Sequence, residues 1–286
     1  MAGETKSGNG RHTVRVGVFI PTDCQVLDAA SVDIMGTMSY EWSVSILHGR
    51  YAYTNSLFFR PNFELVSAVV PRAVIDLAPL VKIRYIGSVK AGEPIKLTSN
   101  ETILATNHFS DPEVAPGKLD IVHVPGPDPF RGFPADALAW LREQANTPGV
   151  DILSVCSAIF LCGEAGLLKG RRACGPRGMQ DMIKAKGYGE KELLGHKYRW
   201  IQDGNFWSSG GVTNGNDLVA AYCRASKHFP DPIVEIACEM TDVGDRPQEY
   251  GKDDRLLVMT TYFKCAIRWY MGRLYKYMGD ERARGG

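Results

Sequence analysis

The stretch Asp151-Ile152-Leu153-Ser154-Val155-Cys156-Ser157-Ala158 decides how this chain of 286 residues is interpreted. The five residues before Cys156 are mostly apolar, which is typical of a buried strand, and small residues follow at once. A helical pattern then continues to about Leu168. Cys156 therefore stands at a sharp bend between strand and helix, where a side chain projects away from the sheet as in a nucleophile elbow.

This position makes Cys156 a candidate for a reactive thiol. Ser157 and Ala158 are the small neighbours that such a bend requires. The N-terminus of the following helix is expected to lower the pKa of the thiol, because the positive end of the helix dipole favours thiolate. The alternative is a buried core cysteine at the end of a strand. Spacing alone does not separate the two interpretations.

Strand and helix patterns alternate along the rest of the chain. Strands are expected at Val14–Ile20, Ile83–Ile86, Leu119–Val124, Asp151–Val155 and Phe206–Ser209, with a hairpin over Ile95–Leu104. Helices are expected at Val26–Met38, Ala135–Gln144, Gly215–Ala225 and, in a long apolar pattern rich in Tyr, Leu256–Met278. This alternation predicts βαβ units and an α/β fold with a mainly parallel central sheet.

Composition and charge exclude several classes of function. Charged residues make up 23% of the chain and the formal net charge is +1, without a basic stripe, so no nucleic-acid partner is expected. No apolar run approaches the roughly 20 residues of a membrane span, so no membrane partner is expected either. The polar, Gly-rich start does not resemble a secretory signal, and we expect a cytoplasmic protein.

The cysteine pattern argues against structural crosslinks. Seven cysteines are present, an odd number, and none forms a C-x-x-C pair. This disfavours both a disulfide framework and a thiolate zinc site, so we expect no metal.

The chain is expected to contain one main domain. We predict a disordered tail over residues 1–13, the α/β domain over 14–250 and a C-terminal helical extension over 251–286. Residues 48–82 show no clear period and are interpreted as an insertion or a lid. The apolar helical pattern within the extension suits a capping helix or a dimer face.

Two further strand ends provide candidates for the same site. Asp28 follows the first strand and interrupts an apolar face, so its carboxyl is able to be buried, protonated and hydrogen-bonded to a thiolate. Gly126 follows the strand that ends at Val124 and would bring a backbone N–H close to a developing oxyanion. His123, just before it, would line the pocket. The alternatives are a surface acid, a proline-bounded turn and a buried core histidine.

Together these segments resemble the ThiJ/PfpI superfamily, from about Val14 to Tyr250. The resemblance is carried by four motifs: Leu27-Asp28 with Asp33, Val124-Pro125-Gly126, Val155-Cys156-Ser157 followed by Gly163-Glu164-Ala165-Gly166-Leu167-Leu168-Lys169-Gly170, and Ser209-Gly210-Gly211-Val212-Thr213-Asn214-Gly215-Asn216-Asp217. It is similar in particular to isocyanide hydratases and to related fungal proteins of secondary metabolism.

The resemblance implies a flavodoxin-like three-layer sandwich, a homodimer and no cofactor. It also implies roles for the candidates. Cys156 is the expected nucleophile, Asp28 its acidic partner, and Ser157 a donor through its backbone N–H and hydroxyl. Gly126 is expected to contribute to an oxyanion pocket.

Two departures from the family pattern narrow the chemistry. Pro127 stands where the family usually has a second glycine, and proline has no N–H to donate. The histidine that relatives carry shortly after the elbow helix is missing from residues 172–177. Protease or amidotransferase chemistry, in which a histidine activates the cysteine, is therefore disfavoured.

Three hypotheses for function remain. The first is an isocyanide hydratase-like lyase or hydrolase acting on a small electrophilic metabolite. The second is a redox-sensing or stress-protective protein in which Cys156 is oxidised. The third is glyoxalase or deglycase activity on α-oxoaldehydes.

Overall fold

The side chains of β1 (Thr13–Ile20) define the layers of the fold. Val14, Val16 and Val18 enter one apolar cluster, whereas Phe19 enters another on the opposite side of the sheet. This follows from the geometry of a strand, whose successive side chains point to opposite faces. Every residue from Val16 to Ile20 is buried, as expected for a strand covered on both faces.

A central sheet of seven strands forms in the part of the chain that the computed structural model describes, namely residues 10–47, 70–251, 260 and 263–271. Its order is β10-β11-β7-β6-β1-β2-β5, and only β10 runs antiparallel to its neighbour. Besides β1, the strands are β2 (Leu80–Gly87), β5 (Asn107–His108), β6 (Ile121–Val124), β7 (Asp151–Val155), β10 (Trp200–Asp203) and β11 (Phe206–Ser209). The predicted α/β class with a mainly parallel sheet is confirmed.

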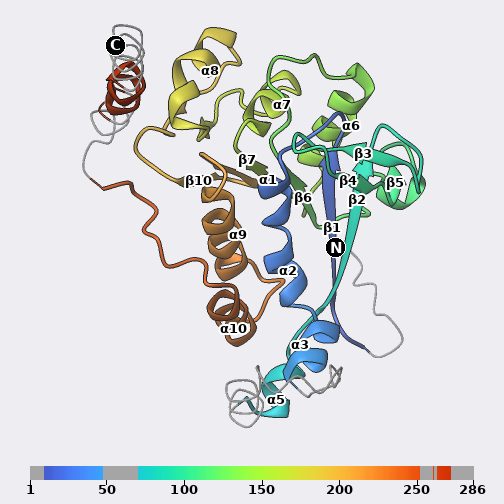
Figure 1. The fold of residues 1–286 in the computed structure, drawn as a ribbon. Helices are drawn as coiled ribbons and strands as arrows, with labels where there is room; N and C mark the ends of the chain where they lie inside the picture. Colours follow the sequence, from blue (N-terminus) through green and yellow to red (C-terminus); the bar gives the residue numbers. More distant parts are fainter. Residues whose placement is uncertain (1–9, 48–69, 252–259, 261–262, 272–286) are drawn as a thin grey trace, which may run out of the picture. The chain divides into compact units, whose positions relative to one another are not determined.

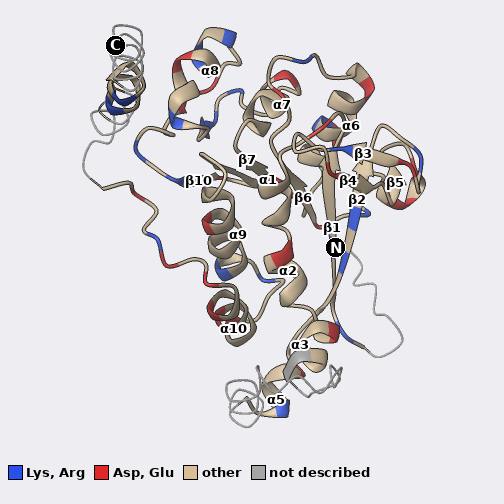
Figure 2. Ribbon diagram, viewed as in Figure 1, with Lys and Arg blue, Asp and Glu red and all other residues tan. Residues whose placement is uncertain are grey.

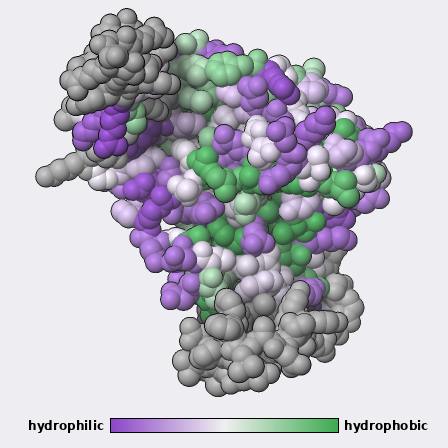
Figure 3. All heavy atoms as spheres, in the orientation of Figure 1, coloured by the Kyte–Doolittle hydropathy of each residue, from purple (hydrophilic) through white to green (hydrophobic). Residues whose placement is uncertain are grey.

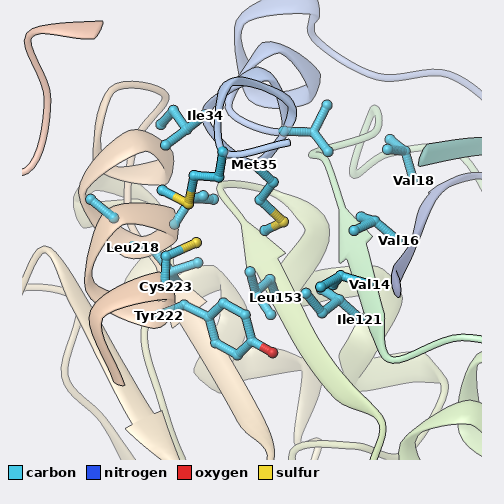
Figure 4. Packing of buried hydrophobic residues seen from close by; sticks show 14 of the residues in the cluster. Val14, Val16, Val18, Ile34, Met35, Ile121, Leu153, Leu218, Tyr222 and Cys223 are labelled. Atoms are coloured by element: carbon cyan, nitrogen blue, oxygen red, sulfur yellow. The ribbon is translucent and has the colours of Figure 1, made fainter. Parts of the chain in front are cut away.

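Helices cover both faces of this sheet (Figure 1). On one face lie α2 (Asp33–Thr37), α9 (Asn214–Ala225) and α10 (Asp231–Thr241), whose apolar residues pack on those of β1, β6 and β7. Figure 4 shows Met35 directed toward Leu153, with Tyr222 of α9 extending toward the same region. On the other face lie α6 (Ala135–Asn146) and α7 (Ala158–Glu164). The arrangement is the three-layer sandwich.

Several element boundaries differ from expectation. The helix expected over 26–38 is two short helices, α1 (Val26–Ala30) and α2, with Ser31 between them. Ser31 Oγ donates to the carbonyl of Asp28 at 2.9 Å, a side-chain bond that competes with helix continuation. The helix expected to reach Leu168 ends at Glu164, because Gly166 adopts a φ of 82°.

Residues 1–13 are not all a tail. Residues 1–9 lie outside the described part, but Arg11 donates to backbone carbonyls at Asp76 and Ala78, and β1 already begins at Thr13. Likewise, residues 48–69 lie outside it, while α5 (Arg72–Ile75) and the start of β2 fall within the interval 48–82. The last residues of that interval are therefore part of the central sheet.

The remaining elements are short or were not expected. The predicted hairpin consists of β3 (Pro94–Lys96) and β4 (Thr102–Leu104), and a second small sheet pairs β8 (Arg172–Ala173) with β9 (Glu192–Leu193). The others are α3 (Tyr40–Leu47), α8 (Gln180–Lys186), and 3-10 helices at Pro112–Val114 and Arg177–Met179.

The chain divides into two compact units, residues 1–248 and 249–286. In the second unit, residue 260 and residues 263–271 are helical; the rest of the helix expected over 256–278 lies outside the described residues. Among the described residues, no helix combines the length and the apolar character that a membrane crossing requires. On the face of the first unit seen in Figure 3, hydrophobic residues gather across the middle, between hydrophilic margins.

Candidate active site

Cys156 occupies the predicted bend and adopts a left-handed backbone conformation, with a φ of 60°. Cys156 directly follows β7, and only Ser157 separates it from α7. A non-glycine residue in this region is strained by roughly 1–3 kcal/mol, and such strain is frequent at functional sites. Five of the seven cysteines are buried, but Cys156 is partly exposed and Cys265 is exposed. The alternative of a buried core cysteine is therefore not supported.

Asp28 lies against Cys156 although 128 positions separate them in the sequence. Its side chain is fully buried, and Oδ2 accepts the backbone N–H of Gly126 at 3.2 Å. Within the described chain, Oδ1 is buried and has no hydrogen-bond partner. The thiol of Cys156 lies close enough to this carboxyl that each of the two groups shifts the pKa of the other. The predicted pairing of the two side chains is thus present in the structure.

Burial makes both groups reluctant to ionise. It raises the pKa of Asp28 to about 7, although the hydrogen bonds from Gly126 and Cys156 act in the other direction. It also raises the pKa of Cys156 to about 12, and the nearby charge of Asp28 raises it further. The expectation of a lowered thiol pKa is therefore wrong: desolvation and the neighbouring carboxylate outweigh the N-terminus of a helix of only two turns.

The two raised pKa values describe a pair that shares a proton. Asp28 therefore loses its proton before Cys156 does, and the thiol keeps its proton at neutral pH. A thiolate then forms when the remaining proton moves from Cys156 to Asp28, so that no charge is added to the buried site. The carboxyl is both the acceptor of the thiol proton and the donor that can return it.

Gly126 has a different role from the expected oxyanion donor. Its N–H is already donated to Asp28, and its carbonyl accepts the N–H of Gln25 at 3.0 Å. A Cβ at this position would lie 2.5 Å from Asp28 Oδ2 and 2.6 Å from Ser157 Oγ. The absence of a side chain at Gly126 is what allows Asp28 and the Cys156 turn to approach each other.

Ser157 secures the turn from the other side. Its hydroxyl donates to the carbonyl of Pro127 at 2.6 Å, which ties the start of α7 to the loop after β6. Its backbone N–H is hydrogen-bonded to the sulfur of Cys156, and this lowers the thiol pKa against the larger effect of burial. The hydroxyl of Ser157 acts on the thiol in the same direction and is also engaged with the loop.

His123 does not line the pocket. It lies fully buried on β6, where Nε2 is 3.0 Å from the carbonyl oxygen of Asp28 and 3.2 Å from Ser31 Oγ. Burial lowers the pKa of His123 to about 4, so the ring is neutral and donates to the carbonyl through Nε2. It positions the backbone that carries Asp28, as a buried core histidine.

A cavity of about 800 Å³ opens over Cys156 and Ser157. The hairpin β3–β4 and the loops after β1 and β6 supply most of its walls. Apolar residues line one part of it, namely Ile20, Pro21, Val89, Pro94, Ile95, Leu97, Pro127, Pro129, Pro176 and Met179, and polar or charged residues line the rest, among them Asp23, Lys96, Asn100, Asp128 and Arg131. This volume lies in the range of small-molecule sites. The convergence of strand ends predicted such a site, but its hairpin wall was missed because those residues carry no catalytic motif.

An ion-pair cluster joins two loops at the cavity wall and was also missed. Asp23 accepts the backbone N–H of Asp128 at 2.9 Å and pairs with Arg131 at 3.2 Å. Arg131 also lies 3.5 Å from the carboxylate of Asp128. The acid Asp23, placed directly after a buried strand and five residues before Asp28, was the sequence signal for this cluster. Across the described residues, no group of three or more His, Cys, Asp or Glu is arranged to hold a metal ion.

Comparison with known proteins agrees with this architecture. A crystal structure of a ThiJ/PfpI family protein from Pseudomonas syringae superposes with a TM-score of 0.59 at 17% identity, covering 90% of this chain and 88% of that one. Drosophila melanogaster DJ-1beta superposes with a TM-score of 0.54 at 14% identity, over 81% and 98% of the two chains. These likenesses confirm the flavodoxin-like fold.

Sequence comparison adds a relative and a family. The chain is 28% identical to the isonitrile hydratase of Pseudomonas putida over 160 residues, which is 55% of this chain and 65% of that protein, just under two thirds of its length. The DJ-1/PfpI family model matches residues 56–225, a span that contains Gly126, Cys156 and Ser157 and begins after Asp28. With a match over more than half of its length, the chain belongs to the DJ-1/PfpI family.

Proposed function

We propose that this protein is a cofactor-independent, cysteine-dependent enzyme that hydrates a small electrophilic metabolite, in the manner of an isocyanide hydratase. The observation that carries the proposal is the proton-sharing pair of Asp28 and Cys156 beside a cavity of about 800 Å³. The similarity to an isonitrile hydratase supports the same substrate class.

The pair suits addition to a carbon that needs a proton. Cys156 Sγ gives its proton to Asp28 and bonds to the terminal carbon of the isocyanide, and Asp28 then delivers the proton to that carbon, which leaves a thioimidate. Water adds across the C=N bond, with its hydroxyl on carbon and its hydrogen on nitrogen. The C–S bond breaks, sulfur recovers the hydroxyl proton, and an N-substituted formamide leaves.

The hydrogen-bond donors around Cys156 favour this reaction over amide hydrolysis. Attack on an amide carbonyl develops charge on oxygen and needs free N–H donors. Here the N–H of Gly126 is engaged by Asp28, and Pro127 has none. Attack on an isocyanide develops charge on carbon, which the proton held by Asp28 can neutralise directly.

Three variants test the proposal against a panel of alkyl and aryl isocyanides. Cys156→Ser is expected to abolish formamide formation, and Asp28→Asn to reduce it by at least 100-fold, since the variant cannot hold the proton. Asp28→Glu should retain part of the activity. In the wild type, kcat/KM should rise with pH through about 7, as the pair loses its first proton. Turnover that survives in Cys156→Ser would reject the proposal.

Redox sensing is the second candidate, favoured by the partial exposure of Cys156 together with its hydrogen bonds to Asp28 and Ser157. The same groups are able to hold the oxygens of a sulfinate. Peroxide treatment followed by peptide mass analysis distinguishes it: two oxygens confined to Cys156, with no turnover of isocyanides or α-oxoaldehydes, would favour the sensor. Turnover of α-oxoaldehydes alone would instead indicate glyoxalase or deglycase activity. Exposed Cys265 serves as the internal control for non-selective oxidation.

We also propose that the enzyme works in the cytoplasm, as a homodimer, on a metabolite of a secondary pathway. The free thiols support a reducing compartment, since no cysteine is paired. The hydrophobic area on the face of the first unit supports self-association (Figure 3). Light scattering on the full chain tests the dimer, and a monomer throughout the working concentration range would reject it.

A further inference from the structure

The helix in the second unit presents an apolar face that the proposed chemistry does not use. Every residue from 263 to 271 is exposed. Phe263, Ile267, Tyr270 and Met271 recur at helical spacing and so share one face; 67% of Phe263, 45% of Ile267 and 62% of Tyr270 is exposed. We call these four residues the apolar face. Large apolar side chains gathered in this way mark an interaction surface.

The residues beside the apolar face are basic and lack acidic counterparts. Lys264 and Arg268 are four residues apart and therefore lie on the same side of the helix. In Figure 2 the described part of this helix shows blue and no red. In the sequence, the whole stretch from Leu256 to Gly279 contains two more cations, Arg273 and Lys276, and no Asp or Glu.

This charge pattern disfavours a second copy of the same helix as the partner. Pairing two copies along the apolar face would bring the cations of each helix near those of the other, without an acid in the stretch to compensate them. Like charges across a helix pair are destabilising. A partner with dense negative surface charge and an apolar interior would pair with the cations and would also bury the apolar face.

We propose that the apolar face inserts into the headgroup region of an anionic phospholipid bilayer, with the helix lying in the plane of the membrane. Phe263, Ile267 and Tyr270 would reach the acyl boundary, while Lys264 and Arg268 extend to the phosphates. Exposed aromatic side chains suit the interface between lipid and water. The helix binds the surface of the membrane and does not span it, whereas the expectation of no membrane partner considered spanning segments alone.

Sedimentation with vesicles tests this on the full chain. Vesicles of phosphatidylcholine alone are compared with vesicles that also contain phosphatidylserine, at low and at high salt. The wild type is expected to pellet with the anionic vesicles only and to be released by salt, because screening weakens attraction to the surface. Ile267→Asp, and separately Lys264→Glu with Arg268→Glu, should each reduce the pelleted fraction at least five-fold.

Leu77→Asp is the matched control, because Leu77 is an apolar residue of the first unit with 51% of its surface exposed. It should pellet like the wild type. Circular dichroism on each variant establishes that the chain is folded. Pelleting that is absent, or that Ile267→Asp leaves unchanged, overturns the proposal. Ile267→Asp converting a lipid-independent dimer to a monomer, with no vesicle binding in either protein, would identify self-association instead.

Discussion

At the scale of single residues, the backbone of Cys156 is strained, which lowers the stability of the fold but positions the reactive sulfur. Its φ of 60° places a side chain where glycine would be relaxed. The strain aims the sulfur at Asp28 and the cavity. The cost should therefore be measurable by removing the side chain altogether.

Cys156→Gly is expected to raise the free energy of unfolding relative to Cys156→Ala by about 1 kcal/mol, because alanine retains the strained Cβ and glycine does not. Both variants lose the thiol, so the difference isolates the backbone conformation. Urea denaturation of the two variants provides the measurement. Equal midpoints would show that the turn is not strained.

Asp28 should oppose folding at alkaline pH. Its pKa is raised from 3.8 to about 7 in the folded protein, so the folded state prefers the protonated form. The contribution of Asp28 to the free energy of unfolding is therefore fully present below about pH 4 and is lost as the pH rises to about 7. This loss is roughly 4 kcal/mol at most, because the thiol of Cys156 shares the proton. Asp28→Asn should remove this loss. Its melting temperature relative to the wild type should increase from pH 4 to pH 8, and an unchanged difference would contradict a buried, neutral carboxyl.

At the scale of elements, the site depends on the close meeting of β6, β7 and α1. Gly126, in the loop two residues after β6, is the contact point, because a Cβ there would also lie 2.9 Å from the backbone nitrogen of Ser157. Backbone cannot move aside as a flexible side chain does. Small changes at this position should therefore affect both stability and the pairing of Asp28 with Cys156.

Gly126→Ala is expected to destabilise the fold by about 1–3 kcal/mol, as overpacking does, and to reduce alkylation or turnover at Cys156. Gly132→Ala is the matched control, since a Cβ at Gly132 meets nothing within 4 Å. Thermal melting and iodoacetamide labelling, followed at the Cys156 peptide, measure both effects. Similar behaviour of the two variants would show that the close approach is not required.

The elements with a strong apolar pattern were predictable, and the others were not. The sequences of β1, β6 and β7 predicted buried strands, and their parallel arrangement placed Asp28 near Cys156. By contrast, β10 is a short edge strand with the polar residues Gln202 and Asp203, and α10 begins within Pro230-Asp231-Pro232, which reads as a turn. The sequence did not predict that the Gly126 N–H is donated to Asp28, because this direction depends on atomic contacts that residue spacing does not determine.

At the scale of the whole molecule, the opposite end of β1 is fixed by titratable groups. His12 Nε2 lies 3.1 Å from His228 Nδ1, and the two rings stack. Close by, Arg15 pairs with Asp120 at 2.6 Å, which with its hydrogen bonds lowers the pKa of that carboxyl. His228 follows α9, so this cluster ties the N-terminal strand to the helical layer.

His228 should make the fold sensitive to acid. Burial lowers its pKa, with the opposing effect of Asp120 smaller, so the folded state prefers the neutral ring. The contribution of His228 to the free energy of unfolding is then fully present above the ordinary histidine pKa of about 6.5, and it is lost as the pH falls below that value. His228→Phe keeps a stacking ring without the titration, so its melting temperature should fall less than that of the wild type between pH 7 and pH 5. Parallel declines in the two proteins would place the acid sensitivity elsewhere, and Asp120→Asn would then test the neighbouring ion pair.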